Sequence, residues 1–270
     1  MDQTNLNNIH VLVTRPEHQA QGLCQALEKS GATALPFPVL EITDPQDIAS
    51  AKKTVQQLEN YNWLIFISAN AVERAFALME QENVVLPDSC KVAAIGRSTA
   101  DKLHELKVKE VLIPQQRFDS EGLLAQPELS ELTGQKVLIF RGEGGREILG
   151  KTLQQQGAEV VHVAVYRRVK PDGDLDKIEK NSVDIAIVTS NQSIQNLWQM
   201  AGKKHQRWLK QVALVVMSER NRECAKKTGY QGEIIVASQQ NDEGLLAAVQ
   251  QWKNKNRARK GPMADKNSGA

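Results

Sequence analysis

Hydroxyl, amide and arginine side chains recur where short apolar runs give way to helix-like segments. Each of six such turns offers a residue that caps a helix through its side chain, and four of them add an arginine. Helix N-termini attract anions, and arginine pairs with carboxylates through two hydrogen bonds. The predicted chemistry is therefore the binding of an anionic ligand, although helix capping alone is the competing interpretation for any single position. The candidate binding residues are Arg15, Ser68, Asn70, Gly96, Arg97, Ser98, Thr99, Arg141, Gly142, Gly145, Arg146, Ser190, Asn191, Ser218 and Arg220.

The stretch RGEGGRE, residues 141–147, has the glycine density of a phosphate-binding loop. Glycines let backbone amides approach an anion closely, and Arg141 and Arg146 could pair with carboxylates. For Arg146 an ordinary ion pair on a helix surface is the competing interpretation. The spacing fits neither GxGxxG nor the Walker pattern, because no GK[ST] follows. A dinucleotide is therefore not expected, and no cofactor is predicted.

Sequence patterns for other chemistries are missing. The five histidines have no metal-ligand spacing with one another or with a cysteine, so no metal site is predicted. No GxSxG nucleophile motif occurs, which disfavours hydrolase chemistry. Cys24, Cys90 and Cys224 lack CxxC spacing, and their odd number is typical of free thiols in a reducing compartment.

The composition is that of an ordinary globular chain. Of its 270 residues, 41% are hydrophobic and 24% are charged, and the formal net charge is +2. The charges are spread along the chain, so the basic field that binds nucleic acid is missing. No apolar run approaches the roughly 18 residues of a membrane span, and the first ten residues lack the regions of a signal peptide. We expect a cytoplasmic protein with neither a nucleic acid nor a membrane as partner.

The elements that must position the candidate residues alternate between strands and helices. Near-continuous apolar runs, rich in β-branched residues, occur at 9–14, 62–68, 91–96, 109–114, 135–140, 158–163, 183–190, 211–218 and 232–237. Such runs suit strands that are buried on both faces of a parallel sheet, and the segments between them begin with N-cap residues. The pattern predicts an α/β protein whose ligand lies at the carboxyl ends of its strands.

A duplication is visible within the chain. The heptapeptide DSEGLLA at Asp119–Ala125 returns as NDEGLLA at Asn241–Ala247. Sliding the chain along itself by 122 to 126 residues also lays Val11–Ala32 over Val137–Ala158 and pairs Ser68 with Ser190. The matching order of these blocks favours two homologous halves over the general likeness of any two α/β segments.

Seven blocks resemble, in this order, those of bacterial uroporphyrinogen-III synthases: LVTRP, AIGRSTA, LIPQQ, LIFRGEGGRE, VYRR, VTS and VVMSER. The resemblance runs from about Val11 to Ala248. It implies two similar parallel-sheet α/β domains joined by a two-stranded linker, an arrangement that permits large domain motions. Residues 1–37 and 171–253 would form a discontinuous first domain, residues 38–170 the second, and residues 254–270 a disordered tail. With the duplication, each domain would combine the opening βαβ unit of one half with the later strands of the other.

The resemblance implies a cyclising lyase of haem biosynthesis. Its reaction converts hydroxymethylbilane to uroporphyrinogen III, with loss of water and inversion of ring D through a spiro intermediate. A free bilane would close without inversion, so the enzyme must hold this linear, polycarboxylate tetrapyrrole in a cleft between its domains and supply a proton donor near the departing hydroxyl. Tyr166 matches the family's linker tyrosine and is the predicted catalytic residue, because a phenol donates without being charged at neutral pH. Simple packing of a half-buried tyrosine is the competing interpretation.

Two other functions stay open. A non-enzymatic two-domain protein that closes on an anionic small molecule would share this architecture. A nucleotide-dependent enzyme would show a nucleotide-induced thermal shift, which this sequence does not lead us to expect. The resemblance implies a monomer, and a transient contact with the enzyme that makes hydroxymethylbilane stays open as well.

Overall fold

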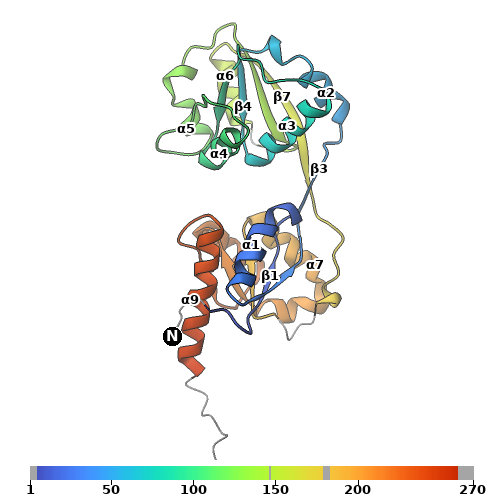
Figure 1. Cartoon of the computed structure of the whole chain (residues 1–270), viewed down its shortest axis with the longest axis vertical. Helices are drawn as coiled ribbons and strands as arrows, with labels where there is room; N and C mark the ends of the chain where they lie inside the picture. Colours follow the sequence, from blue (N-terminus) through green and yellow to red (C-terminus); the bar gives the residue numbers. More distant parts are fainter. Residues whose placement is uncertain (1–4, 146, 179–182, 261–270) are drawn as a thin grey trace, which may run out of the picture. The chain divides into compact units, whose positions relative to one another are not determined.

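The computed structural model describes residues 5–145, 147–178 and 183–260. The chain divides into two compact units, shown in Figure 1: unit 1 comprises residues 1–41 and 169–270, and unit 2 comprises residues 42–168. From the sequence, the domain boundaries were predicted between residues 37 and 38 and between residues 170 and 171. Arg146 and residues 261–270, which the sequence predictions include, lie outside the described residues.

Unit 1 is built on a five-stranded sheet in the order β10-β9-β8-β1-β2, and its neighbouring strands pair in parallel. The strands are β1 (His10–Val13), β2 (Thr33–Pro36), β8 (Ile185–Val188), β9 (Ala213–Val216) and β10 (Ile234–Val236). Its helices are α1 (Glu17–Lys29), α7 (Asn191–Leu209), α8 (Glu219–Thr228) and α9 (Asp242–Lys260), with the 3-10 turn η3 (Leu175–Lys177).

Both faces of this sheet are covered by helices. Successive side chains of a strand point to opposite faces, so Val11 and Val13 pack with residues of α1 and α9, whereas Leu12 packs with residues of α7 and α8. All three residues are fully buried. This two-sided burial explains why the strand sequences are almost continuously apolar.

Unit 2 is built on a second five-stranded sheet in the order β3-β7-β6-β4-β5, in which β7, β6, β4 and β5 pair in parallel. The strands are β3 (Glu41–Thr43), β4 (Trp63–Phe66), β5 (Lys91–Ala94), β6 (Lys136–Gly142) and β7 (Glu159–Val169). One face is covered by α2 (Ile48–Val55), α3 (Ala69–Gln81) and α4 (Arg97–Glu105), and the other by α5 (Ser120–Leu124) and α6 (Ile148–Gln155). The 3-10 turns η1 (Leu58–Asn60) and η2 (Pro127–Leu129) complete the unit.

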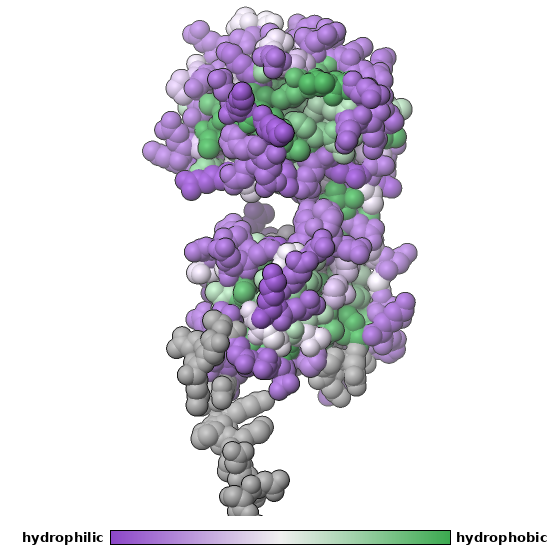
Figure 2. Space-filling model, viewed as in Figure 1, coloured by the Kyte–Doolittle hydropathy of each residue, from purple (hydrophilic) through white to green (hydrophobic). Residues whose placement is uncertain are grey.

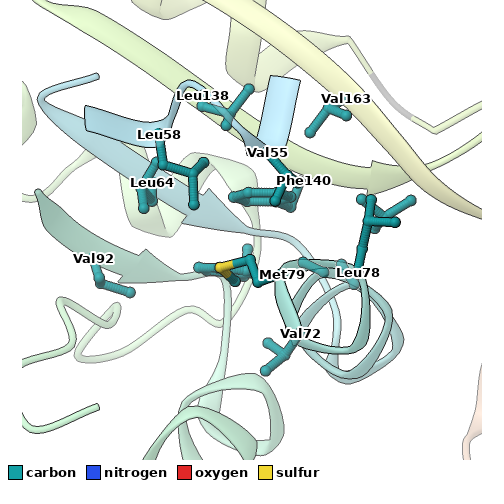
Figure 3. Packing of buried hydrophobic residues seen from close by; sticks show 14 of the residues in the cluster. Val55, Leu58, Leu64, Val72, Leu78, Met79, Val92, Leu138, Phe140 and Val163 are labelled. Carbon is teal, nitrogen blue, oxygen red and sulfur yellow. The ribbon is translucent and has the colours of Figure 1, made fainter. Parts of the chain in front are cut away.

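The first of these two cores is shown in Figure 3. Leu64, Leu138 and Phe140 project from the sheet toward Val72, Leu78 and Met79 of α3. Phe140 stacks on Phe66 with ring centroids 4.7 Å apart. The α/β class and the parallel sheets predicted from the apolar runs are therefore confirmed.

Three predictions about elements differ from the structure. The run at 109–114 forms only an isolated bridge, between Leu112 and Ala93, and Pro114 has no N–H with which to extend a ladder. Strand β2 was missed because its two end residues, Thr33 and Pro36, are exposed and interrupt the apolar run. Residues 254–260, expected in a disordered tail, continue α9, since their Lys, Arg and Ala residues are good helix formers.

The repeated heptapeptide forms the same local structure twice. The side chain of Asp119 accepts a hydrogen bond from the N–H of Gly122, and that of Asn241 accepts one from the N–H of Gly244, each at 2.9 Å. A Cβ atom at either glycine would collide with a carbonyl oxygen, at 1.7 and 2.2 Å respectively. Each copy is therefore a helix start that requires glycine three residues after the cap.

Candidate functional site

The turns of unit 2 follow three neighbouring strands. Strands β5, β4 and β6 pair in register, with Phe66 opposite both Ala94 and Phe140. The carboxyl ends of parallel strands meet at one sheet edge. Ser68 lies two residues after the end of β4 and Gly96 two residues after the end of β5, and residues 141–145 contain the end of β6 and the turn after it, so all of them share that edge.

Ser68 and Gly96 begin the two helices at this edge. The Oγ atom of Ser68 accepts a hydrogen bond from the N–H of Ala71 at 3.1 Å and so caps α3, whereas Gly96 caps α4 without a side-chain bond. Asn70 lies partly exposed in the first turn of α3. Ser98 is exposed, but Thr99 is 2% exposed, so its side chain is not accessible to a ligand in this structure. Arg97 is exposed and lies over the ring of Phe118 at 4.8 Å.

Two glycines in residues 141–145 leave space that neighbouring side chains of the protein occupy. A Cβ atom at Gly142 would lie 2.6 Å from the ring of Tyr166, and one at Gly145 would lie 2.7 Å from the guanidinium of Arg141. A register shift between Arg141 and Gly142 sets Gly142 opposite Tyr166 on β7. The structure thus gives both glycines a packing role. The sequence did not reveal the contact of Gly142, because its partner Tyr166 lies on the neighbouring strand β7.

Tyr166 is 2% exposed and belongs to the core that Figure 3 shows in part. Its hydroxyl lies 3.1 Å from Ser68 Oγ and accepts a hydrogen bond from Arg168 Nη2 at 3.2 Å. The Arg168 guanidinium is 5.5 Å from the centre of the tyrosine ring. The predicted catalytic residue is therefore buried, and its phenol is hydrogen-bonded to Ser68, which is itself only partly buried.

Sequence reasoning missed Arg168 as a member of this cluster. It lies two residues after Tyr166 on the same strand, so the two side chains share a face of the sheet. That spacing was the signal that could have found it.

Arg141 also shifts the charge balance near this edge. Desolvation first, and the Arg141 charge second, lower the pKa of His162, while Glu147 acts in the opposite direction. A lowered pKa favours the neutral form of the imidazole.

In unit 1 the first candidate, Arg15, follows β1. Its side chain is 13% exposed, and its Nη1 atom lies 2.5 Å from a carboxylate oxygen of Asp242 at the start of α9. The charge of Arg15 is thus balanced within unit 1. Sequence reasoning missed this pairing because 227 residues separate the partners.

The other candidates of unit 1 follow β8 and β9, which are neighbours in the sheet. Ser190 caps α7, Ser218 caps α8, and the side-chain amide of Asn221 joins the two helix starts by donating to Asn191 Oδ1 at 2.7 Å. Next to this bond is a pocket of about 600 Å³, lined by Asn191, Gln195, Arg220, Glu223, Cys224, Lys227 and Thr228. Its two cations, Arg220 and Lys227, suit a carboxylate ligand.

Another groove of unit 2 lies elsewhere. Its volume is about 1590 Å³, and it is lined at the amino ends of β4 and β5 by Trp63 and Lys91, with Phe76, Val85 and Leu106. Apolar side chains gather on one face of this unit in Figure 2. None of the candidate binding residues lines the groove, which lies at the sheet edge opposite to theirs.

The described part of the chain offers neither a metal centre nor a membrane span. It contains no cluster of three or more His, Cys, Asp or Glu side chains that could hold a metal ion. None of the described helices combines the length and the apolar character needed to cross a membrane.

Comparison with known proteins places these features in a family. The family model for uroporphyrinogen-III synthase HemD matches residues 21–247. The uroporphyrinogen-III synthase of Escherichia coli K12 is 34% identical over 245 residues, which cover 89% of this chain and 99% of that protein. The uroporphyrinogen-III synthase of Salmonella typhimurium LT2 is 33% identical with the same coverage. A crystal structure of a mutant uroporphyrinogen III synthase from the extremely thermophilic bacterium Thermus thermophilus is similar in fold, with a TM-score of 0.59 at 15% identity, covering 94% of this chain and all of that one.

Proposed function

Because the chain belongs to the uroporphyrinogen-III synthase family, we propose that it cyclises hydroxymethylbilane to uroporphyrinogen III. It is a cyclising lyase of porphyrin biosynthesis, and the reaction releases water and inverts ring D. The observation that carries this conclusion is the family match over residues 21–247. The similarity spans nearly the full length of the Escherichia coli enzyme, so it is not confined to one unit. This match does not favour a non-enzymatic binding protein.

The proposed substrate-binding groups are those at the two carboxyl-end sheet edges. Hydroxymethylbilane carries many carboxylates, and helix N-termini with nearby guanidinium groups bind carboxylates without a basic protein surface. In unit 2 these groups are the starts of α3 and α4 with Arg97 and Arg141, and in unit 1 the starts of α7 and α8 with Arg220. Arg15 contributes less charge than its type suggests, because Asp242 neutralises it.

The proposed catalytic task is mainly one of holding geometry. Closure without inversion competes in solution, so the protein must keep ring D in the orientation from which its substituted carbon attacks. The Tyr166 hydroxyl assists the departure of the substrate hydroxyl as a proton source. The hydrogen bonds of that phenol to Ser68 and Arg168 support this assignment.

We propose that the two units arose by duplication and exchange. Under the shift that aligns the halves, β1 and β2 correspond to β6 and β7, and β4 and β5 correspond to β8 and β9. Unit 1 has the order β10-β9-β8-β1-β2, and unit 2 has β5-β4-β6-β7 with the Leu112 bridge beside β5 in the place of β10. The matching strand orders of the two sheets support an exchange of the opening βαβ segments between the units. We also propose that the protein is a monomer and receives its substrate in a transient contact with the enzyme that makes it.

The test supplies hydroxymethylbilane, generated in situ, to the purified protein and separates the oxidised products as porphyrin isomers by chromatography. Isomer III is expected in excess, with a rate that saturates as substrate increases. Isomer I alone, at the rate of a control without protein, would refute the proposal. Saturable binding without product would instead indicate the binding protein.

A further inference from the structure

The burial of Tyr166 conflicts with direct proton donation to a substrate. Only 2% of its surface is exposed, yet its hydroxyl is 3.1 Å from Ser68 Oγ, and Ser68 is partly exposed at the edge where ligand is proposed to bind. A proton from the phenol can therefore reach that edge through the serine. The cluster also contains Arg168, whose exposed guanidinium bonds to the phenol oxygen.

The donors and acceptors in this cluster limit where each proton can lie. Arginine has only donors, so the phenol oxygen accepts from Arg168. Either hydroxyl can donate in the bond between the phenol and Ser68 Oγ, and we assign the phenol as the donor because Arg168 already uses one lone pair of its oxygen. The serine oxygen also accepts from the N–H of Ala71 at 3.1 Å. Both lone pairs of that oxygen are then used, which leaves the serine proton available to a ligand.

We propose that Ser68 is the group that protonates the departing hydroxyl, that Tyr166 resupplies Ser68, and that Arg168 is a positioning residue for the phenol. The inference rests on the proposed function. As the C–O bond breaks, its electron pair stays with the oxygen, which takes the serine proton and departs as water. The phenol proton moves to Ser68 Oγ, and the resulting phenolate lies beside the Arg168 guanidinium. The proton that the substrate loses when the macrocycle closes returns to the phenolate, so the cycle balances without an added reactant.

Two further features hold the phenol in line. Gly142 has no side chain, which allows the tyrosine ring to lie where a Cβ atom would otherwise be 2.6 Å away. The N–H of Glu143 donates to the carbonyl of Tyr166 at 2.9 Å and fixes the backbone after the register shift. A positive charge that is already in place stabilises a developing anion without reorganisation of its surroundings. Arg168 is assigned this role toward the phenolate of Tyr166.

The decisive experiment is a double-mutant cycle of Ser68→Ala and Tyr166→Phe, with kcat, KM and the share of isomer III as readouts. The relay predicts that each single change lowers kcat by about a hundredfold or more with little change in KM. The double variant should lose no more of its kcat than the worse single variant, because both changes interrupt the same proton relay. Ser68→Thr keeps the hydroxyl and should retain activity. Losses that multiply in the double variant, or full activity of Ser68→Ala, would overturn the proposal.

A matched control separates catalysis from helix capping. Asp47 caps α2 in the same unit by accepting from the N–H of Ser50 at 2.9 Å and does not belong to the cluster. Asp47→Ala should lower the melting temperature about as much as Ser68→Ala while leaving kcat unchanged. An equal loss of kcat in both variants would assign the Ser68 effect to the lost cap and overturn the relay.

Arg168 is tested through its dependence on Tyr166. Arg168→Met should lower kcat in the wild-type background but not in the Tyr166→Phe background, and Arg168→Lys should recover part of the loss. A raised KM with unchanged kcat would make Arg168 a carboxylate-binding residue and overturn its positioning role. If the wild-type protein yields only isomer I, the proposed function itself fails, which distinguishes that outcome from failure of the relay.

Discussion

Tyr166 combines two roles that sequence reasoning treated as alternatives. Its ring is part of the core of unit 2, and its hydroxyl bonds to Ser68 and Arg168 at a sheet edge. A buried hydroxyl with hydrogen-bond partners is held in one orientation, because loss of those partners would leave it desolvated and unpaired. The packing of the ring therefore determines where the phenol proton can go.

Gly142→Ala tests that dependence of chemistry on packing. The added methyl group would lie 2.6 Å from the ring, so the tyrosine must move and we expect kcat to fall to about the level of Tyr166→Phe. Gly22→Ala in α1 is the matched control, since its Cβ would make an ordinary contact at 3.5 Å and should add about 0.5–1 kcal/mol of stability. Full activity of Gly142→Ala would show that the ring position does not matter.

Tyr230 is a buried tyrosine without the polar partners that Tyr166 has. It is 4% exposed, its hydroxyl has no hydrogen-bond partner among the described residues, and burial raises its pKa far above the ordinary value. Tyr230→Phe should therefore keep the free energy of unfolding at pH 7 or raise it by up to about 1 kcal/mol. A loss of more than about 1 kcal/mol in urea unfolding would reveal a partner for this hydroxyl.

The raised pKa of Tyr230 also leads to a prediction for alkaline pH. Above about pH 10 the phenol ionises in the unfolded chain, while the folded chain keeps it protonated. The wild-type protein should consequently lose stability relative to Tyr230→Phe as the pH rises through that range. Parallel stability curves for the two proteins would contradict the assigned pKa direction.

At the scale of elements, sequence predicted what is set locally. Ser68, Ser190 and Ser218 were predicted as N-caps and are N-caps, because a cap depends on residues within one helical turn. Apolar runs likewise identified eight strands at or near their observed positions, since burial on both faces leaves a continuous signal. The contacts that define the site were not predictable in this way. Gly142 against Tyr166 and Arg15 with Asp242 depend on how distant segments pack.

Ion pairs between η3 and α7 make the stability of the fold depend on acidic pH. The hydrogen bond from Lys204, followed by the charges of Lys204 and His205, lowers the pKa of Asp176, whose Oδ1 lies 2.7 Å from His205 Nε2. A lowered pKa stabilises the fold above the unfolded pKa of about 4 and ceases to do so as pH falls through the folded value.

Asp176→Asn should therefore destabilise the protein at pH 7 and reduce its loss of stability on acidification below about pH 4. Asp101→Asn is the control, since Asp101 is exposed on α4. Chemical unfolding at several pH values measures both effects. Identical acid profiles for wild type and Asp176→Asn would contradict a contribution from this ion pair.

At the scale of the whole molecule, each unit has its own pair of cores, one on each face of its sheet. Unit 2 is continuous in sequence, whereas unit 1 needs two segments. Unit 2 has the length of an ordinary domain. We expect a fragment of residues 42–168 to fold cooperatively on its own, and residues 169–270 to require residues 1–41, which supply β1, β2 and α1. Amide hydrogen exchange and thermal unfolding of the fragments would measure this, and an unfolded 42–168 fragment would contradict it.

The central claim is that this protein is a catalyst that controls the orientation of ring D. The most direct measurement is the isomer composition of the product when about one molecule of protein meets a hundred or more of hydroxymethylbilane, because a binding protein in that ratio could redirect only a small fraction of the substrate. We expect isomer III to dominate at this limiting protein concentration and its initial rate to scale with protein. A product mixture that remains mostly isomer I, or that shifts to isomer III only at stoichiometric protein, would contradict the account.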